Sequence, residues 1–174
     1  MTEPRRELVR ACYPGTFHPP TVAHLAVAHA AIEQLGIDQV VFVLSRQTLG
    51  KDDSILPAPV HRAQELKSLT EIHGDRFDVA ISNHSLLVEI AGGFDWVIVG
   101  ADKWHQINEL RWYGNDRTQR DAAVAALPRV AIVPRPPFEV PERTPARTVL
   151  HIAEHFGEVS STAVRAGRLD WRAT

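Results

Sequence analysis

Short apolar runs alternate with longer amphipathic stretches along the chain. Residues 40–44 are β-branched, aromatic or aliphatic without a polar interruption, which is typical of a strand covered on both faces of a parallel sheet. Between residues 21 and 35, apolar side chains recur at helical spacing, and Gly36 follows as a natural helix end. Strands that alternate with helices in this way predict crossover units and a parallel sheet.

The same patterns predict the remaining elements. Strands are expected at residues 8–13, 40–44, 77–81, 96–99 and 130–133. Helices are expected at residues 21–35, 60–73, 85–91, 116–126 and in the last motif at 159–165, while 102–112 stays ambiguous. The helix at 60–73 is expected to turn Ala63, Leu66, Leu69 and Ile72 inward, and proline-rich residues 134–145 to wrap the surface. We therefore expect one α/β domain spanning residues 1–174, a Rossmann-like, doubly wound sheet of about five parallel strands.

Composition narrows the class of protein. The chain has 174 residues, 44% hydrophobic and 23% charged, with a net charge of −2, so a basic nucleic-acid surface is not expected. Its one cysteine, Cys12, excludes an internal disulfide framework. No apolar run is long enough to span a membrane, and the amino terminus lacks a signal-peptide core. We expect a soluble, cytoplasmic protein that binds small molecules, neither nucleic acid nor membrane; a homo-oligomer stays open.

In an open parallel sheet, ligands bind at the carboxyl ends of the strands, near the point where the strand order reverses. That rule directs attention to the loops after the first, second and fourth strands. Those loops carry residues 15–24, 46–51 and 100–102. Neither a G-x-G-x-x-G nor a Walker A loop is present, which disfavours the common dinucleotide-binding and ATPase sites.

The first motif covers residues 13–25, Y-P-G-T-F-H-P-P-T-V-A-H-L. Gly15 lets the backbone approach a ligand closely. Thr21 and His24 lie three residues apart at a helix start and share a face. The N–H groups of that first turn suit a phosphate, and an imidazole donor beside them suits a phosphate oxygen whose charge grows in the transition state. A proline-rich turn with a capping threonine is the ordinary alternative.

The second motif is V-S-S-T-A-V-R at residues 159–165. Ser160, Ser161 and Thr162 place hydroxyls at a helix start, and Arg165 follows three residues after Thr162. Hydroxyls, backbone N–H groups and a guanidinium together make an anion site. A helix cap with a solvated arginine is the alternative. Because the two motifs lie at opposite ends of one domain, the pair is more specific than either alone.

With both motifs in place, the chain resembles the nucleotidyltransferase superfamily that carries the T/H-x-x-H and S-S-T-x-x-R signatures, over residues 8–168. Members include adenylyltransferases of nicotinate or nicotinamide mononucleotide and of phosphopantetheine, and cytidylyltransferases. The resemblance implies that Thr21, His24 and Arg165 are catalytic. It implies a nucleotide site made of Gly15, Thr16, Phe17, His18, Lys51, Gly100, Asp102, Ser160, Ser161 and Thr162. It also makes Arg62 a weaker candidate for substrate binding.

Two positions depart from the family pattern. His18 stands where many members have Asp or Asn, and Ala23 stands where many have Gly. The change at Ala23 is small. His18 either alters substrate or metal contacts or replaces one hydrogen-bonding group with another, and its role stays open.

The reaction that the resemblance implies is an in-line displacement. The phosphate of the acceptor attacks the α-phosphorus of ATP, and pyrophosphate leaves. Because the attacking phosphate is already ionised at neutral pH, the protein acts by positioning and by stabilising charge. Mg²⁺ is expected with the triphosphate, held mainly by phosphate oxygens and water. No metal site built from protein residues is expected, since the histidines show no clear ligand spacing.

Two acceptors compete in this resemblance. The Y-P-G-T-F segment with Thr21 resembles the phosphopantetheine enzymes, whereas V-G-A-D at residues 99–102 resembles the pyridine-nucleotide branch. Arg135, in I-V-P-R-P, also resembles the latter, so nicotinate or nicotinamide mononucleotide is favoured. Trp104 and Trp112 could stack on a pyridinium ring, or could simply anchor a loop.

Proteins of two other kinds would share part of this pattern. A tRNA-synthetase relative would share the histidine motif, but the chain has no K-M-S-K-S-like loop and little room for tRNA domains. A non-catalytic nucleotide-binding module is the more serious rival. It would keep the phosphate contacts without releasing pyrophosphate.

Overall fold

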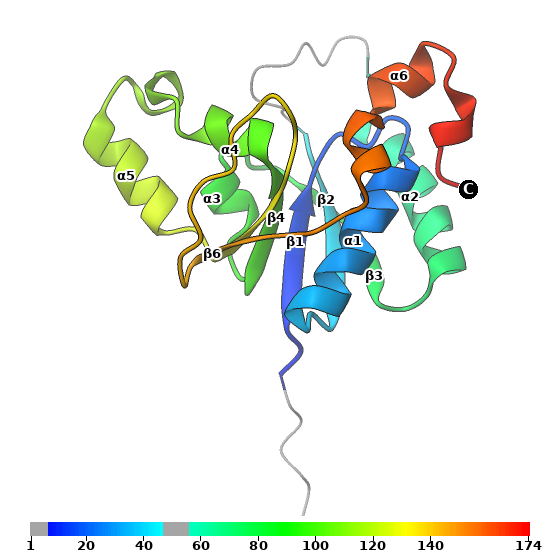
Figure 1. Cartoon of the computed structure of the whole chain (residues 1–174), viewed down its shortest axis with the longest axis horizontal. Helices are drawn as coiled ribbons and strands as arrows, with labels where there is room; N and C mark the ends of the chain where they lie inside the picture. Colours follow the sequence, from blue (N-terminus) through cyan, green and yellow to red (C-terminus); the bar gives the residue numbers. More distant parts are fainter. Residues whose placement is uncertain (1–6, 47–55) are drawn as a thin grey trace, which may run out of the picture.

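The computed structural model describes residues 7–46 and 56–174. A six-stranded sheet in the order β3-β2-β1-β4-β5-β6 runs through these residues, and every neighbouring pair is parallel. The strands are β1 (Arg10–Pro14), β2 (Gln39–Ser45), β3 (Phe77–Ser82), β4 (Trp96–Gly100), β5 (Arg129–Val133) and β6 (Arg147–Val149). The chain builds outward from β1 in one direction and from β4 in the other. The strand order therefore reverses between β1 and β4 (Figure 1).

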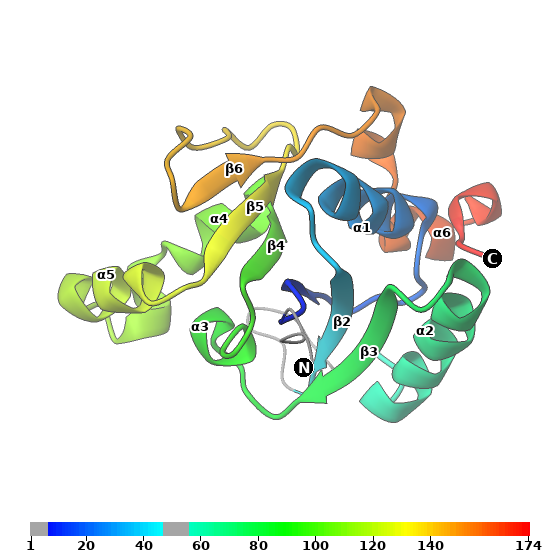
Figure 2. The ribbon, with the colours of Figure 1, turned by 90° about the horizontal axis from the view of Figure 1, so that it is seen from below.

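Helices cover both faces of this sheet. They are α1 (Val22–Leu35), α2 (Pro59–His73), α3 (Leu87–Ile90), α4 (Ala101–Ile107), α5 (Arg117–Ala125) and α6 (Ser161–Arg165), with 3₁₀ turns η2 (Leu110–Tyr113), η3 (Glu154–Glu158) and η4 (Leu169–Trp171). Seen from below, α1 and α2 lie on one side of the sheet and α3, α4 and α5 on the other (Figure 2). This arrangement confirms the predicted doubly wound α/β class. No helix in the described ranges has the length and apolar character to cross a bilayer.

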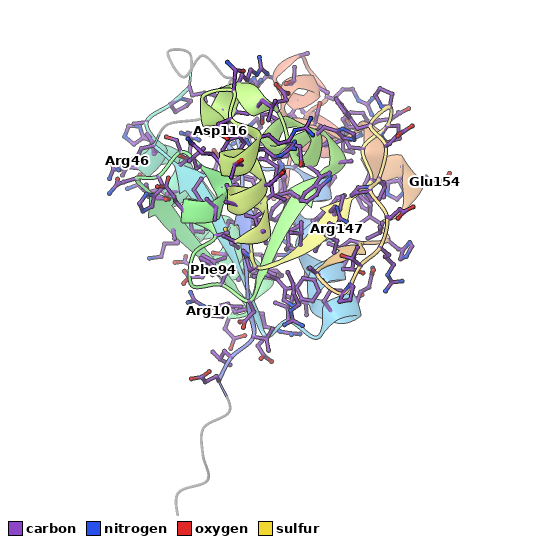
Figure 3. The ribbon with its side chains drawn as sticks, turned by 90° about the vertical axis from the view of Figure 1, so that its left-hand side faces the viewer. Arg10, Arg46, Phe94, Asp116, Arg147 and Glu154 are labelled. Atoms are coloured by element: carbon purple, nitrogen blue, oxygen red, sulfur yellow. The ribbon has the colours of Figure 1, made fainter. Side chains whose placement is uncertain are left out.

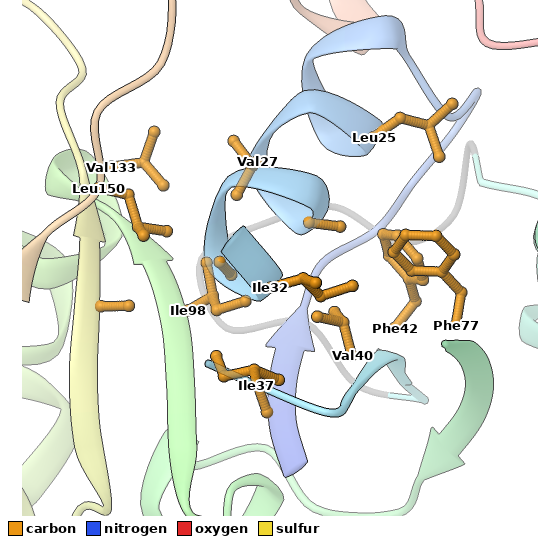
Figure 4. Close-up of a cluster of buried hydrophobic side chains, with 14 of the residues drawn as sticks. Leu25, Val27, Ile32, Ile37, Val40, Phe42, Phe77, Ile98, Val133 and Leu150 are labelled. Atoms are coloured by element: carbon orange, nitrogen blue, oxygen red, sulfur yellow. The ribbon is translucent and has the colours of Figure 1, made fainter. Parts of the chain in front are cut away.

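Two clusters of buried side chains fill the spaces between the sheet and its helices. One joins α1 and α2 to the sheet and includes Phe42, Leu66 and Ile98 (Figure 4). The other lies on the opposite face and includes Val41, with side chains from α3 and α4. Adjacent residues of β2 thus point into different clusters, as the period of two along a strand requires.

Helix α1 begins at the threonine cap that the sequence offered as the ordinary alternative, and it ends at the predicted Gly36. Thr21 is the N-cap: its side chain accepts from the His24 N–H, while the His24 side chain accepts from the Thr21 N–H, which makes a capping box. Gly36 ends the helix with φ of +64°, in the left-handed region that glycine enters without steric cost. Asp116 likewise caps α5, at the start of the helix expected over residues 116–126.

Two expectations are wrong in detail. The sheet has six strands, not about five, because the three-residue β6 is too short to show a period-two pattern after the proline-rich segment. Ile72 does not face inward but is 72% exposed. It lies six residues past Leu66, roughly 240° around a helix of 3.6 residues per turn, so the buried stripe continues through Leu69 and Thr70 instead.

Candidate active site

A cavity of about 320 Å³ opens at the carboxyl ends of β1, β4 and β5. It therefore lies beside the reversal of strand order, where an open parallel sheet binds its ligands. Twelve of the residues predicted for the site line it: Gly15, Thr16, Phe17, His24, Gly100, Asp102, Trp112, Arg135, Ser160, Ser161, Thr162 and Arg165. Thr21, His18, Arg62 and Trp104 do not line it, and Lys51 lies outside the described residues.

The loop after β1 forms one wall of the cavity. The Gly15 N–H donates to the Val43 carbonyl at 3.1 Å, which ties the loop to β2. A Cβ at Gly15 would lie 2.6 Å from the Phe17 ring, so only glycine lets that ring pack over the turn. Phe17 itself is 1% exposed and has φ of +46°, an unusual conformation for a bulky residue. Its ring meets the His24 imidazole edge to face, with the centroids 4.9 Å apart.

His24 points one ring nitrogen at the backbone. The Thr21 N–H donates to His24 Nδ1 at 2.9 Å. Because Nδ1 accepts this hydrogen bond, the neutral ring carries its proton on Nε2. Thr21, which is 1% exposed, therefore acts on the cavity through His24: it caps α1 and fixes the tautomer of the imidazole.

The second motif meets this loop across the fold. Ser160 caps α6 by accepting from the Ala163 N–H at 3.1 Å. Ser161 Oγ donates to the Pro19 carbonyl at 2.7 Å. Arg165 donates to the His18 carbonyl and, at 3.1 Å, to Thr162 Oγ1. The two motifs, about 140 residues apart in sequence, thus form one hydrogen-bonded unit at one end of the cavity.

The carboxyl-terminal segment also supports this loop. The Ala173 N–H donates to the Pro20 carbonyl at 3.1 Å, and Arg172 forms an isolated antiparallel bridge with Thr21. Pro19 and Pro20 have no N–H groups, so the loop cannot close its own turn with their hydrogen bonds. Donors from other segments hold it in place.

Asp102 and Arg135 lie together in the cavity at the switch point. Asp102 Oδ1 is 3.8 Å from Arg135 Nε, and both side chains are partly exposed to the cavity. A Cβ on Gly100 would collide with the Asp102 carboxylate, so glycine leaves room for that carboxylate to lie over the strand end. Tyr13 lines the same region, and burial is the main reason that the pKa of its hydroxyl is raised.

Aromatic and polar side chains line the far end. Trp112 Nε1 is buried and has no hydrogen-bond partner among the described residues, while Arg111 stacks 4.5 Å from the ring. Tyr113 donates from its hydroxyl to the Ile107 carbonyl at 2.8 Å, which fixes η2 against α4. Lys103 Nζ donates to Gln106 Oε1 at 2.8 Å, and both residues line the cavity.

Other predicted residues are placed behind the cavity wall. Trp104 is 7% exposed and packs in the core beneath Arg147, which projects from the edge strand β6 (Figure 3). Arg62 is 3% exposed. His18 lines a neighbouring hollow with Arg165 and Arg172.

The His18 ring is unusual in two ways. Its Nδ1 is buried without a hydrogen-bond partner among the described residues. Burial, and then the positive charge of Arg165, lower the pKa of the imidazole below its usual value. The ring is therefore held in its neutral form, and its carbonyl rather than its side chain contacts Arg165.

Several lining residues were not predicted. They are Tyr13, Ser85, Leu86, Leu87, Ile90, Lys103, Gln106, Tyr113 and Phe156, among others. Ser85 and Leu86 follow β3, so the rule of loops at strand ends would have found them if it had been applied to that strand. The apolar members carry no chemical signal in the sequence.

Metal-binding residues do not gather anywhere in the part of the chain that the structure describes: no group of three or more His, Cys, Asp or Glu side chains could hold an ion. Asp102 is the one carboxylate among the described residues that line the cavity, and it lies near Arg135. A Mg²⁺ ion at this site would therefore be held mainly by triphosphate oxygens and water.

Comparison with known proteins identifies the family. The model of the cytidylyltransferase-like family matches residues 12–167, a range that contains both motifs at the cavity. The chain belongs to this family. Among curated relatives, a probable nicotinate-nucleotide adenylyltransferase of Bacteroides thetaiotaomicron is 29% identical over 171 residues, 91% of this chain and 81% of that protein. A protein of the same name from Rubrobacter xylanophilus is 29% identical over 128 residues, 66% of this chain and 59% of that protein.

Solved structures agree with the cytidylyltransferase-like fold. The nicotinic acid mononucleotide adenylyltransferase of Plasmodium falciparum complexed with APC superposes with a TM-score of 0.66 at 17% identity, covering 92% of this chain and 83% of that one. The same enzyme complexed with NaAD gives a TM-score of 0.61 at 18% identity, covering 90% and 82%. At this identity the likeness supports the fold.

Proposed function

We propose that this protein is an adenylyltransferase that moves AMP from ATP to nicotinate mononucleotide and releases pyrophosphate. The observation that carries the proposal is that hydrogen bonds join the two motifs at one end of the cavity. The other end of the same cavity has room for an acceptor. The names of the two curated relatives favour the nicotinate acceptor. Because ATP is plentiful in the cytoplasm, we place the reaction there.

Residues at the phosphate end of the cavity act on different parts of the triphosphate. His24 presents Nε2–H to an α-phosphate oxygen, where it stabilises the negative charge that develops during displacement. The hydroxyls of Ser160 and Thr162, together with Arg165, bind the departing pyrophosphate, while Ser161 holds the loop through its bond to the Pro19 carbonyl. The acceptor phosphate needs no general base, so orientation toward the α-phosphorus is the main task of the protein. Mg²⁺ bound to the triphosphate neutralises part of its charge.

The acceptor occupies the end of the cavity lined by α4 and η2. The Asp102 carboxylate suits the hydroxyls of a ribose, and Arg135 suits a phosphate or carboxylate. The Trp112 ring is a surface on which a positively charged pyridinium can stack. Trp104, buried beneath Arg147, takes no part in this contact.

Pyrophosphate release with Mg-ATP tests the proposal directly. The acceptors to compare are nicotinate mononucleotide, nicotinamide mononucleotide, phosphopantetheine and glycerol 3-phosphate, each repeated with CTP. We expect release with nicotinate mononucleotide and ATP, and loss of that signal in Arg165→Met purified in the same way. Release only with phosphopantetheine, or only with CTP, would replace the acceptor or the nucleotide. ATP binding without release for any acceptor would favour a non-catalytic binding module.

A further inference from the structure

Arg62 is a buried cation that does not touch the cavity. Its side chain is 3% exposed, although arginine is seldom fully buried without a partner. Nη1 donates to the Thr16 carbonyl at 2.8 Å, and Nε donates to the Pro57 carbonyl at 3.0 Å. The guanidinium therefore joins the beginning of α2 to the loop that forms the phosphate end of the cavity.

The bond to Thr16 fixes a peptide plane. The cis peptide bonds of the described residues are at His18-Pro19 and Pro136-Pro137, so the Thr16–Phe17 peptide is trans. In a planar trans peptide, the carbonyl oxygen and the following N–H point in opposite directions. Since Arg62 holds the Thr16 oxygen, the Phe17 N–H points away from the Arg62 guanidinium, in a loop whose residues Thr16 and Phe17 both line the cavity.

The Phe17 N–H makes no hydrogen bond within residues 7–46 and 56–174. We propose that Arg62 is a positioning residue, which aims this N–H at a phosphate oxygen of the bound nucleotide without touching the nucleotide itself. The inference rests on the proposed function for the identity of the ligand. The family resemblance made Arg62 a candidate for substrate binding; this inference gives it an indirect role instead.

Three variants separate positioning from charge and from stability. Arg62→Met removes both hydrogen bonds and the charge. Arg62→Lys keeps a positive charge but lacks the planar fork that reaches two carbonyls at once. Arg76→Met is the control for the loss of two such hydrogen bonds, because the exposed Arg76 also donates to two backbone carbonyls, those of Ile37 and Asp38, and does not line the cavity.

The readouts are thermal stability, kinetics with ATP varied, and binding of a non-hydrolysable ATP analogue followed at the Phe17 amide by ¹⁵N NMR. We expect Arg62→Met and Arg62→Lys to lower kcat/KM for ATP by about 10- to 100-fold, as small misplacements near reacting groups do. Arg76→Met should lose stability only. In the parent protein the analogue should shift the Phe17 amide strongly, and in both Arg62 variants this shift should disappear.

Two results would overturn the positioning role. Restored activity and an unchanged amide shift in Arg62→Lys would mean that the charge alone matters. A kcat/KM for ATP that falls no further in the Arg62 variants than in Arg76→Met would mean that the residue only stabilises the fold. Because the amide shift needs binding and not turnover, it reports on Arg62 even if no acceptor releases pyrophosphate.

Discussion

At the scale of single residues, the two nitrogens of His24 have separate tasks. Nδ1 accepts the Thr21 N–H at 2.9 Å and so completes the cap of α1, which leaves Nε2 to carry the proton. The imidazole is held in a T-shaped contact with Phe17, whose position depends in turn on Gly15. A single hydrogen-bond donor in the cavity is therefore oriented by a helix cap, an aromatic contact and a glycine.

His24→Asn separates these tasks. An asparagine oxygen can replace Nδ1 as the acceptor in the cap, but nothing replaces the Nε2 donor. We expect kcat to fall about 100-fold, as the loss of one preorganised donor does, with little change in the free energy of unfolding. Steady-state pyrophosphate release and urea denaturation measure the two quantities. Full activity in this variant would refute the phosphate contact of His24.

Residues whose type and spacing indicate phosphate binding could be identified from the sequence, whereas the burial of a side chain could not. Gly15, His24 and Arg165 were predicted for the site and line the cavity. Arg62, from the family resemblance, and Trp104, as a ring that could stack, were also predicted but lie behind the wall, since their positions depend on helix packing that no local pattern reveals. Tyr13 is the reverse: it lines the cavity, but in the sequence it looks like an ordinary residue near the end of a strand.

At the scale of elements, the phosphate end of the cavity is assembled from pieces that are too short to be stable alone. α6 has five residues, and the loop at residues 15–20, which follows β1, has no regular structure. Ser161 and Arg165 join α6 to the Pro19 and His18 carbonyls, so each piece fixes the other. The sequence showed both motifs, but their mutual hydrogen bonds depend on the fold that brings them together.

Ser161→Ala tests this connection. The variant leaves the Pro19 carbonyl, in a residue that is buried, without its 2.7 Å donor. An unsatisfied buried acceptor costs about 1–3 kcal/mol, which corresponds to a loss of roughly 5- to 150-fold in kcat/KM for ATP if α6 and the loop separate. Ser68→Ala is the control, because Ser68 donates to the Gln64 carbonyl on the exposed face of α2. Equal kinetics in both variants would count against a connecting role for Ser161.

Element boundaries show where local signals suffice. The helix end at Gly36 and the helix start near residue 116 were predicted correctly, because caps act through residues close in sequence. The sixth strand, by contrast, exists through its pairing with β5 over three residues, and no three-residue segment carries a strand pattern of its own. Ile72 was misplaced because apolar character alone does not give the angle of a residue around its helix.

At the scale of the whole molecule, the strands connect the two hydrophobic clusters. In β1, Ala11 belongs to one cluster and Cys12 to the other, and burial raises the pKa of the Cys12 thiol to about 12. Phe42 and Val43 divide in the same way along β2. Neither cluster can lose its packing without exposing the strands that build the other, so we infer that the described residues fold as one domain.

This inference predicts a single cooperative unfolding transition. The four tryptophans lie in β4, α4, η2 and η4, so they sample both sides of the sheet and the segment after α6: Trp96, Trp104, Trp112 and Trp171. In protein labelled with 5-fluorotryptophan, all four native ¹⁹F signals should disappear at one urea concentration, which matches the midpoint from far-UV circular dichroism. Earlier loss of the Trp171 signal would instead make the segment that holds the phosphate loop a separate unit. ATP should then delay that earlier step alone, because ligand stabilises only the unit that binds it.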